Sequence, residues 1–327
     1  MTLTKSLLAG VALTALTGGA ALAEPALIFD LGGKFDKSFN EAAFHGAQRW
    51  AEETGGTYKE LEMQSEAQRE QALRRLAETG ANPIVMTGFA FGDVLNQVAP
   101  DYPDTQFAII DMVVEQPNVQ SVVFTEEQGS YLAGIMAAMA SKSGTVGFIG
   151  GMEIPLIKKF ECGFAQGFKA ARPDGRVVVN YTGTTPAAWN DPVKGGELAR
   201  AQKGDGADVI YAAAGGTGIG VLQAAADEGI LSVGVDSNQN HLHPGKVLTS
   251  MVKRVDTAVY DAFKNGVEPG VKVLDLAAEG VDVAIDDSNK ALITPEMQAA
   301  VDEARAGITG GQIAVHDYMT DNACPVQ

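Results

Sequence analysis

Carboxylates and one ammonium group stand at the ends of several short apolar runs in this sequence. Asp30 follows "ALIF", Asp111 follows "FAII", Asp236 ends "LSVGVD", and Lys253 ends "VLTSMVK". A carboxylate accepts hydrogen bonds from N–H and O–H groups, and an ammonium group can neutralise it. One such aspartate is commonly a helix cap or a turn former, but several strand ends of this kind together favour a ligand cleft.

Two aromatic residues lie outside any apolar periodic face. Phe35 is in the glycine-flanked loop "DLGGKFDKSFN", and Trp189 directly precedes Asp191 and Pro192, which begin an expected helix. An aromatic pair can sandwich a flat heterocycle, with each stacking contact contributing about 1 to 3 kcal/mol. The alternative is that each ring only fills an interface between lobes.

Amide and carboxylate groups near these rings are candidates for recognising the edge of a heterocycle. Asn40 offers both a donor and an acceptor, while Asp111 can accept from ring N–H or amino groups. Asp30 could act in the same way or only order its loop. Asp36 is interpreted as a turn residue or as a partner of Lys37.

The glycine cluster "GGTGIG", residues 215–220, follows an expected strand and opens an expected helix. With Asp236 downstream it imitates a dinucleotide fingerprint, but Val221 stands where the last glycine of that motif belongs. We therefore interpret Gly215 and Gly216 as positions of close backbone approach, with free N–H groups at a helix N-terminus. No nicotinamide cofactor is expected.

Motifs of catalysis and metal binding are not found in the sequence. There is no HExxH, no Cys-x-x-Cys and no G-x-S-x-G. The "HLH" at 241–243 lies in a Pro-Gly loop and is interpreted as a solvated turn rather than as part of a metal site. The sequence predicts a binding protein without a catalytic residue, a metal or a cofactor.

Alternating strands and helices must position these candidate residues. Short β-branched runs alternate with amphipathic segments along nearly the whole chain, which indicates βαβ units and parallel sheets flanked by helices. In such sheets ligands bind at the carboxyl ends of the strands. A chain of 327 residues exceeds what one core usually organises, so we expect two lobes of about 150 residues each. The helical patterns lie at 38–53, 65–79, 129–141, 156–171, 192–203, 218–228, 254–265 and 295–306.

The first helical pattern carries a recognisable start signal. Ser38 followed by Glu41 predicts a capping box, and Phe39 and Trp50 share an apolar face that we expect to join the core. The residues before this cap, 30–36, are therefore expected at the end of the first strand.

The first 23 residues have the features of a signal peptide. Lys5, an apolar run too short to span a bilayer, and an Ala-Leu-Ala ending predict cleavage after Ala23. No cysteine stands near this position to accept a lipid, so we expect a soluble periplasmic protein. The formal net charge of −17 argues against nucleic acid and anionic membrane surfaces as partners.

Two cysteines, Cys162 and Cys324, would meet oxidising conditions after export. The sequence does not show whether their Cα atoms come within reach of each other. Both a disulfide and two free thiols are therefore left open.

Several motifs, in order along the chain, resemble the basic membrane protein family of ABC-transporter substrate-binding proteins. The resemblance runs from about residue 26 to about residue 316 and implies a type I periplasmic-binding-protein fold, an α/β fold of two Rossmann-like lobes with parallel sheets and a hinge. Many members have a lipid-accepting cysteine where this chain has Glu24, and often a phenylalanine where it has Trp189. The motifs are "DLGGKFDKSFNEAAFHG", "YLAGIMAAMASKSGTVGFIGG", "WNDPVKGGELA", "AAAGGTGIGVLQAA", "GVDSNQ" and "LTSMVKRVDTAVYDAF".

The best understood members of this family bind purine nucleosides. The resemblance therefore implies a receptor for guanosine, inosine or adenosine that delivers its ligand to an ABC permease at the inner membrane. It places Asp236 and Lys253 among the family's ribose contacts, whereas the alternative is that Asp236 caps a turn and Lys253 pairs with a carboxylate. A purine nucleobase or a flavin as ligand, and a secreted nucleoside-processing enzyme, stay open.

The implied mechanism is closure of a monomer about a hinge. We expect lobe 1 to contain residues 24–126 and 252–280, and lobe 2 to contain residues 127–251 and 281–327. The crossing strands near residues 126, 250 and 280 would absorb the change in backbone angles when the lobes close.

Overall fold

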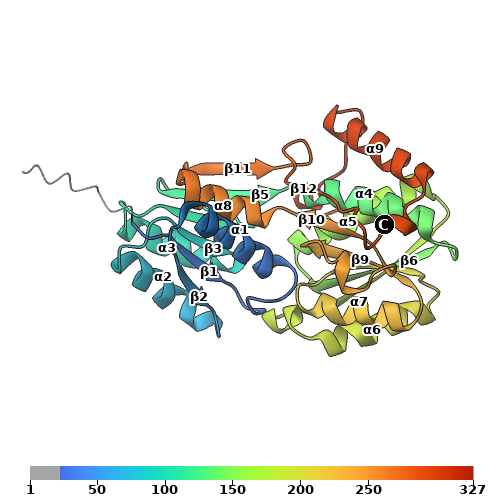
Figure 1. The fold of residues 1–327 in the computed structure, drawn as a ribbon, viewed down its shortest axis with the longest axis horizontal. Helices are drawn as coiled ribbons and strands as arrows, with labels where there is room; N and C mark the ends of the chain where they lie inside the picture. The colour runs from blue at the N-terminus through green and yellow to red at the C-terminus, as the bar shows by residue number, and fades with distance from the viewer. Residues whose placement is uncertain (1–22, 327) are drawn as a thin grey trace, which may run out of the picture.

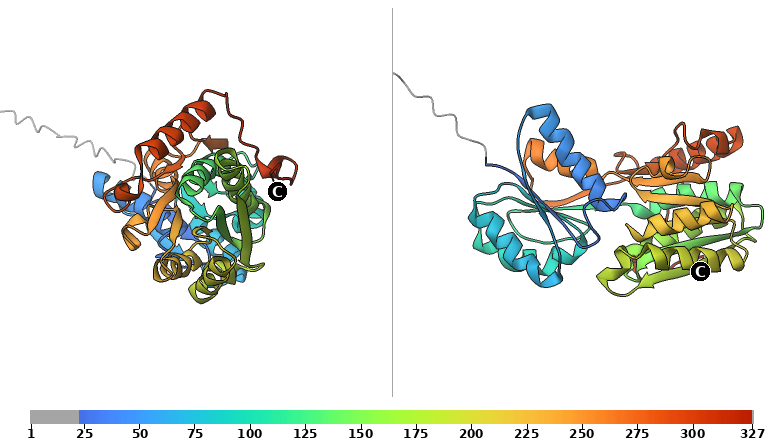
Figure 2. Two further views of the ribbon diagram at one scale, coloured as in Figure 1. Left: turned by 90° about the vertical axis from the view of Figure 1, so that its right-hand side faces the viewer. Right: turned by 60° about the horizontal axis from the view of Figure 1, so that its bottom comes forward.

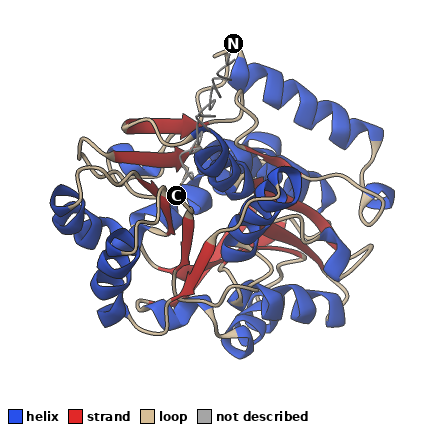
Figure 3. Ribbon diagram, turned by 60° about the vertical axis from the view of Figure 1, so that its left-hand side comes forward, coloured by secondary structure: helices blue, strands red, loops and turns tan. Residues whose placement is uncertain are grey.

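The computed structural model describes residues 23–326 and places them in two α/β lobes side by side (Figure 1). The predicted signal peptide lies outside the described residues, except for Ala23. Each lobe has one six-stranded sheet with helices on both faces (Figures 2 and 3). Within the described part of the chain, no helix has the length and apolar character needed to cross a bilayer.

The sheet of lobe 1 is parallel throughout, in the order β11-β5-β4-β3-β1-β2. Alternate residues of its central strands face opposite layers: Leu27 and Phe29 pack with α1 and α8, while Ala26 and Ile28 pack with α2 and α3. Burial on both faces explains why these strands are continuous apolar runs. The elements are β1 (Ala26–Phe29), α1 (Phe39–Thr54), β2 (Lys59–Glu62), α2 (Arg69–Glu78), β3 (Ile84–Thr87), α3 (Gly92–Val98), β4 (Phe107–Ile110), β5 (Val119–Phe124), α8 (Val255–Asn265) and β11 (Gly270–Leu274).

The sheet of lobe 2 has the order β12-β10-β9-β8-β6-β7, with only β12 antiparallel to its neighbour among the described pairs. Helices α4 and α5 cover one face of this sheet, and α6 and α7 cover the other (Figure 1). The elements are α4 (Glu126–Ala140), β6 (Thr145–Met152), α5 (Pro155–Ala171), β7 (Arg176–Gly183), η4 (Pro186–Trp189), α6 (Pro192–Gly204), β8 (Val209–Ala213), α7 (Thr217–Asp227), β9 (Leu231–Asp236), β10 (Val247–Lys253), β12 (Val281–Val283), α9 (Pro295–Thr309) and η7 (Tyr318–Thr320).

The chain passes between the two sheets three times. It leaves lobe 1 between β5 and α4, returns between β10 and α8, and leaves again between β11 and β12. The first two passages are one residue long each, Thr125 and Arg254, and the third spans residues 275–280. The detailed lobe boundaries stay a prediction.

The start of α1 differs from the predicted capping box. The Ser38 side chain makes no cap hydrogen bond. Instead, the carboxylate of Asp36 accepts from the backbone N–H groups of Ser38, Asn40 and Glu41 at 2.8, 3.0 and 3.1 Å. Glu41 accepts from the N–H of Lys37, not from that of Ser38. The capping box fails because the Ser38 hydroxyl turns toward the other lobe, which a local pattern does not record.

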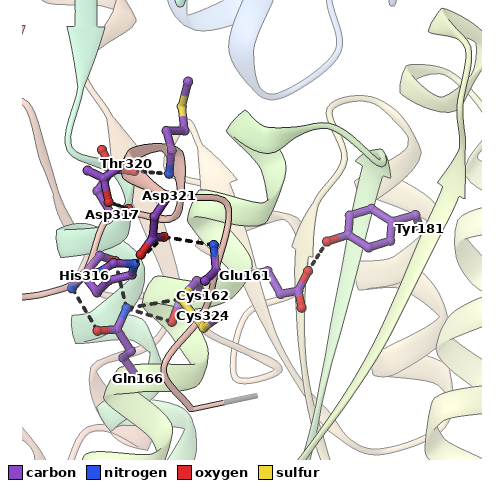
Figure 4. The surroundings of a disulfide bond; sticks show 11 residues. Glu161, Cys162, Gln166, Tyr181, His316, Asp317, Thr320, Asp321 and Cys324 are labelled. Atoms are coloured by element: carbon purple, nitrogen blue, oxygen red, sulfur yellow. Dashed lines mark hydrogen bonds and ion pairs between the residues drawn. A yellow bond between two sulfur atoms is a disulfide. The ribbon is translucent and has the colours of Figure 1, made fainter.

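The C-terminal segment returns from α9 along α5 and ends in a disulfide (Figure 4). Cys162 and Cys324 are joined, with their Cα atoms 5.6 Å apart. The pairing that the sequence left open is therefore present, and it closes a loop of sequence separation 162.

Candidate functional site

A cavity lies between the lobes at the carboxyl ends of the parallel strands, with about 670 Å³ of free space that is partly open to solvent. Phe35 and Gly216 are not in its lining. The predicted ligand-binding residues that line it are Asp30, Asn40, Asp111, Trp189, Gly215, Asp236 and Lys253.

Apolar side chains form much of the remaining wall. Phe39, which we had expected in the core, packs against the core cluster and also lines the cavity. Its position in the first turn of α1 continues the apolar face of that helix, and periodicity alone does not separate a core from a cavity wall. The sequence contained no further signal for the other apolar wall residues, which are Leu31, Phe89, Leu156, Ile157, Phe160, Ala213 and Val235.

Asp30 is held on the lobe 1 side by Arg69. The guanidinium of Arg69 donates through Nε (3.2 Å) and Nη2 (2.8 Å) to Oδ1 of Asp30. Burial raises the pKa of Asp30 above its usual value, although Arg69 opposes this. A Cβ at Gly88 would lie 3.0 Å from Oδ2 of Asp30, so the glycine there gives the carboxylate room. Arg69 lies 39 residues from Asp30 along the chain, and no local sequence pattern pointed to it.

The amide of Asn40 is fully engaged within lobe 1. Its Nδ2 donates to the carbonyls of Asp30 and Gly33, both at 3.1 Å, and its Oδ1 accepts from the hydroxyl of Thr87 at 2.9 Å. An amide side chain has two N–H donors, so both are used here. In this conformation Asn40 therefore orders the loop that follows β1.

Lys253 is the centre of a buried ion cluster at the second passage between the lobes. Its Nζ lies 2.6 Å from Oδ1 of Asp111 and 2.8 Å from Oε1 of Glu126. The rings of Phe39, Phe124 and Phe160 surround the ammonium group, at 4.9–5.5 Å from their centroids. Contacts of this kind between a cation and a ring are favourable and stronger when water is excluded.

The pKa values of this cluster follow from burial opposed by charge pairing. Burial would lower the pKa of Lys253, but Asp111 and Glu126 outweigh it and raise the pKa, so the ammonium form is retained. Burial also raises the pKa of Asp111 above its usual value against the attraction of Lys253. For Glu126 the two lysines, Lys253 and Lys159, outweigh burial and lower the pKa.

Asp236 reaches from lobe 2 to the start of α1 in lobe 1. Its Oδ2 accepts from the hydroxyl of Ser38 at 2.6 Å. Two neighbouring hydrogen bonds also cross between the lobes: Ser237 Oγ donates to the carbonyl of Ser38, and Gln239 Nε2 donates to that of Lys37, both at 2.8 Å. Burial raises the pKa of Asp236 above its usual value, although Lys253 opposes this.

Trp189 packs against glycines of both lobes. A Cβ at Gly151 would lie 2.1 Å from its indole ring, and one at Gly32 in lobe 1 would lie 3.5 Å from its Cβ. Gly215 and Gly216 approach its carbonyl so closely that a Cβ would lie 3.5 and 3.2 Å from the oxygen. The contact is tight at Gly216 and ordinary at Gly215, and the backbone that this glycine cluster meets is that of Trp189.

Phe35 lies outside the cavity in this conformation. Its side chain is 60% exposed, and its ring packs edge-on against Phe44 with the centroids 5.5 Å apart. The ammonium of Lys34 lies 5.1 Å from the Phe35 ring and 3.8 Å from the Phe44 ring. The loop therefore holds Phe35 on the surface of lobe 1, beside the residues that line the cavity.

The chain matches the family model Bmp, described as ABC transporter substrate-binding protein PnrA-like, over residues 24–308. The protein belongs to the Bmp family. As a Bmp protein it is a substrate-binding protein of an ABC transporter and not an enzyme, with a small-molecule ligand and a permease as partners. Proteins of this kind work in the periplasm or outside the cell.

Relatives of this Bmp protein include well-matched sequences from distant organisms. The ABC transporter nucleoside-binding protein BmpA of Lactococcus lactis subsp. cremoris is 33% identical over 320 residues, covering 89% of this chain and 88% of its own. An uncharacterized lipoprotein of Pyrococcus horikoshii is 35% identical over 276 residues, covering 78% of this chain and 67% of its own.

Solved structures confirm the predicted type I periplasmic-binding-protein fold. An ABC transporter solute-binding protein from Aeropyrum pernix K1 matches with a TM-score of 0.82 and 26% identity, covering 90% of this chain and 94% of its own. AraP, an arabinose binding protein from Geobacillus stearothermophilus, matches with a TM-score of 0.60 and 13% identity, covering 84% of this chain and 100% of its own. The second likeness concerns the fold alone.

Proposed function

We propose that this protein binds a purine nucleoside in the cavity between its lobes and delivers it to an ABC permease at the inner membrane. The observation that carries the proposal is one cavity that combines an indole surface, that of Trp189, with buried acceptors, Asp111 and Asp236. A nucleoside has a flat heterocycle that can stack on the indole, and it has N–H and O–H donors that can bond the buried carboxylates. The name of the Lactococcus relative supports the same ligand class.

The base would lie against Trp189, with its polar edge toward Asp30, Asn40 and Asp111. Asp30 retains Oδ2 for this purpose, because Arg69 donates to Oδ1. Asn40 would exchange one of its present hydrogen bonds for one to the ligand. The ribose would lie near Asp236 and Lys253, and the N–H group of Gly215, which lines the cavity, would face an acceptor of the ligand.

Phe35 would complete the stack on the opposite face of the base. It would have to leave Phe44 and turn inward. Its loop contains Gly32 and Gly33 with φ angles of 126° and 89°, and glycines at such positions allow a rearrangement that other residues restrict. We further propose that the protein acts as a periplasmic monomer, cleaved after Ala23.

Native mass spectrometry of the protein as purified, followed by calorimetric titration with guanosine, inosine and adenosine, tests this function. We expect retained or added mass equal to a nucleoside and tight one-to-one binding. Chromatography after incubation should return the nucleoside intact. Tighter binding of guanine, hypoxanthine or a flavin than of every nucleoside would contradict the proposal and favour those ligands.

A further inference from the structure

The C-terminal strap, residues 313–324, is fastened to α5 at two points. Gln166 Nε2 donates to the carbonyl of His316 and Gln166 Oε1 accepts from its N–H, both at 2.9 Å. Further along, the disulfide joins Cys162 to Cys324 (Figure 4). Both α5 partners lie one helical turn apart on the same face, so the strap between them is held against this helix.

Between these two points the strap contributes Asp317 to a buried lysine. Oδ2 of Asp317 lies 3.4 Å from Nζ of Lys159, whose side chain is 9% exposed. The same ammonium donates to the carbonyl of Phe124 at 2.7 Å and lies 3.2 and 3.3 Å from carboxylate oxygens of Glu126 and Glu127. Phe124 ends β5 in lobe 1 and Glu126 begins α4 in lobe 2, so Lys159 bridges the first passage between the lobes.

Glu126 continues the charge chain into the ligand cavity. Its Oε2 faces Lys159, and its Oε1 lies 2.8 Å from Nζ of Lys253, which in turn pairs with Asp111. Charges therefore alternate from Asp317 in the strap to Asp111 in the cavity wall. This row of charged side chains contacts two of the three passages between the lobes. Lys159 and Glu126 lie at the first passage, and Lys253 ends β10 at the second.

Lys159, Glu126 and Glu127 are shielded from water, whereas the side chain of Asp317 at the outer end is 31% exposed. Removal of one member of such a cluster changes how the others share their partners. Without the carboxylate of Asp317, Lys159 would be shared by Glu126 and Glu127 alone. We expect Glu126 to move toward Lys159 and away from Lys253. The hydrogen bond from Lys159 to the Phe124 carbonyl, which restrains the first passage, would weaken as well.

We propose that the C-terminal strap is a hinge clamp, in which Asp317, held in place by the Cys162–Cys324 disulfide, positions Lys253 in the ligand cavity through Lys159 and Glu126. Asp317 is thus a positioning residue for ligand binding although it does not line the cavity. The binding arm of the test rests on the proposed nucleoside ligand, and the exchange arm does not.

The binding arm compares Asp317→Asn with two matched variants by calorimetric titration with guanosine. We expect Asp317→Asn to weaken binding roughly 3- to 30-fold, in the range found for residues that modulate coupling within a network. Asp317→Glu, which keeps the charge, should restore most of the affinity. Asp321→Asn is the control, because Asp321 belongs to the strap but bonds His316 and the N–H of Ala323 instead of Lys159.

Reduction of the disulfide tests whether the strap acts through Asp317. Reduction should weaken guanosine binding by the wild-type protein but add little in Asp317→Asn, since the carboxylate that the disulfide positions is already absent. Equal affinity of Asp317→Asn and the wild type, with only a lower melting temperature, would overturn the clamp. Additive losses would assign the disulfide a different role and would also overturn it.

The exchange arm measures amide hydrogen exchange of the ligand-free protein, oxidised and reduced. We expect faster exchange after reduction at residues 124–127 and 251–254 in addition to the strap. An increase confined to the strap and α5 would contradict the clamp. If wild-type protein binds no nucleoside, the proposed function fails, but this measurement still decides on the clamp.

Discussion

The two walls of the cavity differ in how far their groups are already engaged. On the lobe 1 side, the amide of Asn40 makes three hydrogen bonds within its own lobe, and Asp30 pairs with Arg69. Phe35 rests on Phe44 outside the cavity. In this conformation, the polar groups and the aromatic ring of the lobe 1 wall therefore find most of their partners within lobe 1.

The lobe 2 wall presents its groups to the cavity and to the other lobe. Trp189 lies in the lining, and glycines pack against its backbone. One carboxylate oxygen of Asp236 accepts a hydrogen bond from Ser38 across the lobe interface. Bound ligand gains most from groups that are fixed in place yet have free hydrogen-bonding capacity. We therefore expect lobe 2 to supply more of the binding energy, and lobe 1 to order its loop and complete the site on closure.

Among these variants, we expect Asp236→Ala to cause the largest loss of ligand affinity. It would remove the proposed acceptor for ribose hydroxyls and leave them buried without partners, at a loss of about 2 to 4 kcal/mol, or roughly 30- to 1,000-fold in affinity. Lys253 retains Asp111 and Glu126 as partners, so the fold should persist. Calorimetry with guanosine and guanine checks this, and equal losses for both ligands would remove Asp236 from ribose recognition.

Trp189→Ala should weaken nucleoside binding by roughly 10- to 100-fold, through the loss of one stacking contact of about 1 to 3 kcal/mol. Trp50→Ala is a matched control, because Trp50 packs edge-on against Phe263 and does not line the cavity. Calorimetry should show weaker nucleoside binding for Trp189→Ala than for Trp50→Ala. A loss that is the same in both would mean that Trp189 acts only through stability.

Phe35→Ala should have a smaller effect, at most about tenfold, because the ring must first give up its contact with Phe44 before it can stack on a base. Titration of this variant beside Trp189→Ala measures the difference between the walls directly. A loss for Phe35→Ala as large as that for Trp189→Ala would show that the lobe 1 wall contributes as much binding energy as the lobe 2 wall.

The smallest expected effect is on stability and depends on pH. Burial raises the pKa of Asp36, in the lobe 1 wall, to about 7, and that of Glu127, at the first passage, also to about 7. Between about pH 4 and pH 7 the folded chain therefore holds protons that the unfolded chain has released, and the free energy of unfolding falls as pH rises. We expect a lower melting temperature at pH 8 than at pH 5.

Glu127→Gln isolates the contribution of Glu127. Because glutamine does not ionise, this variant should lose part of the pH dependence and melt roughly 2 to 4 °C higher than the wild type at pH 8. The slope that remains is shared by Asp36 and the other buried acids whose pKa is raised, Asp30, Asp111 and Asp236. Differential scanning calorimetry of ligand-free protein measures both, and an unchanged slope in Glu127→Gln would show that Glu127 does not carry the proton.

Much of the fold and several site residues could be predicted from local sequence patterns. The apolar runs before Asp30, Asp111 and Asp236 indicated strands, and parallel strands bring their carboxyl ends to one edge, where the cavity lies. The cap of α6 by Asp191 was also correctly predicted, since its side chain accepts from the N–H of Lys194. Capping and period are local properties, and neighbouring residues suffice to specify them.

Contacts between distant segments could not be predicted in this way. Arg69 meets Asp30 across 39 residues, and Ser38 meets Asp236 across 198. In each case either partner alone suggests only a surface charge or a helix cap. The pairing depends on which strands lie side by side in the folded lobes.

By itself, the sequence determined the alternation of strands and helices, the two-lobed α/β architecture, and the strand ends at which acidic and aromatic groups collect, because periodicity and turn chemistry act over a few residues. Only the tertiary structure decided that Phe35 lies outside the cavity while Phe39 lines it, and that Cys162 reaches Cys324. It alone joined Asp317 to Asp111 through two buried lysines. These outcomes depend on packing between segments that are distant in the chain.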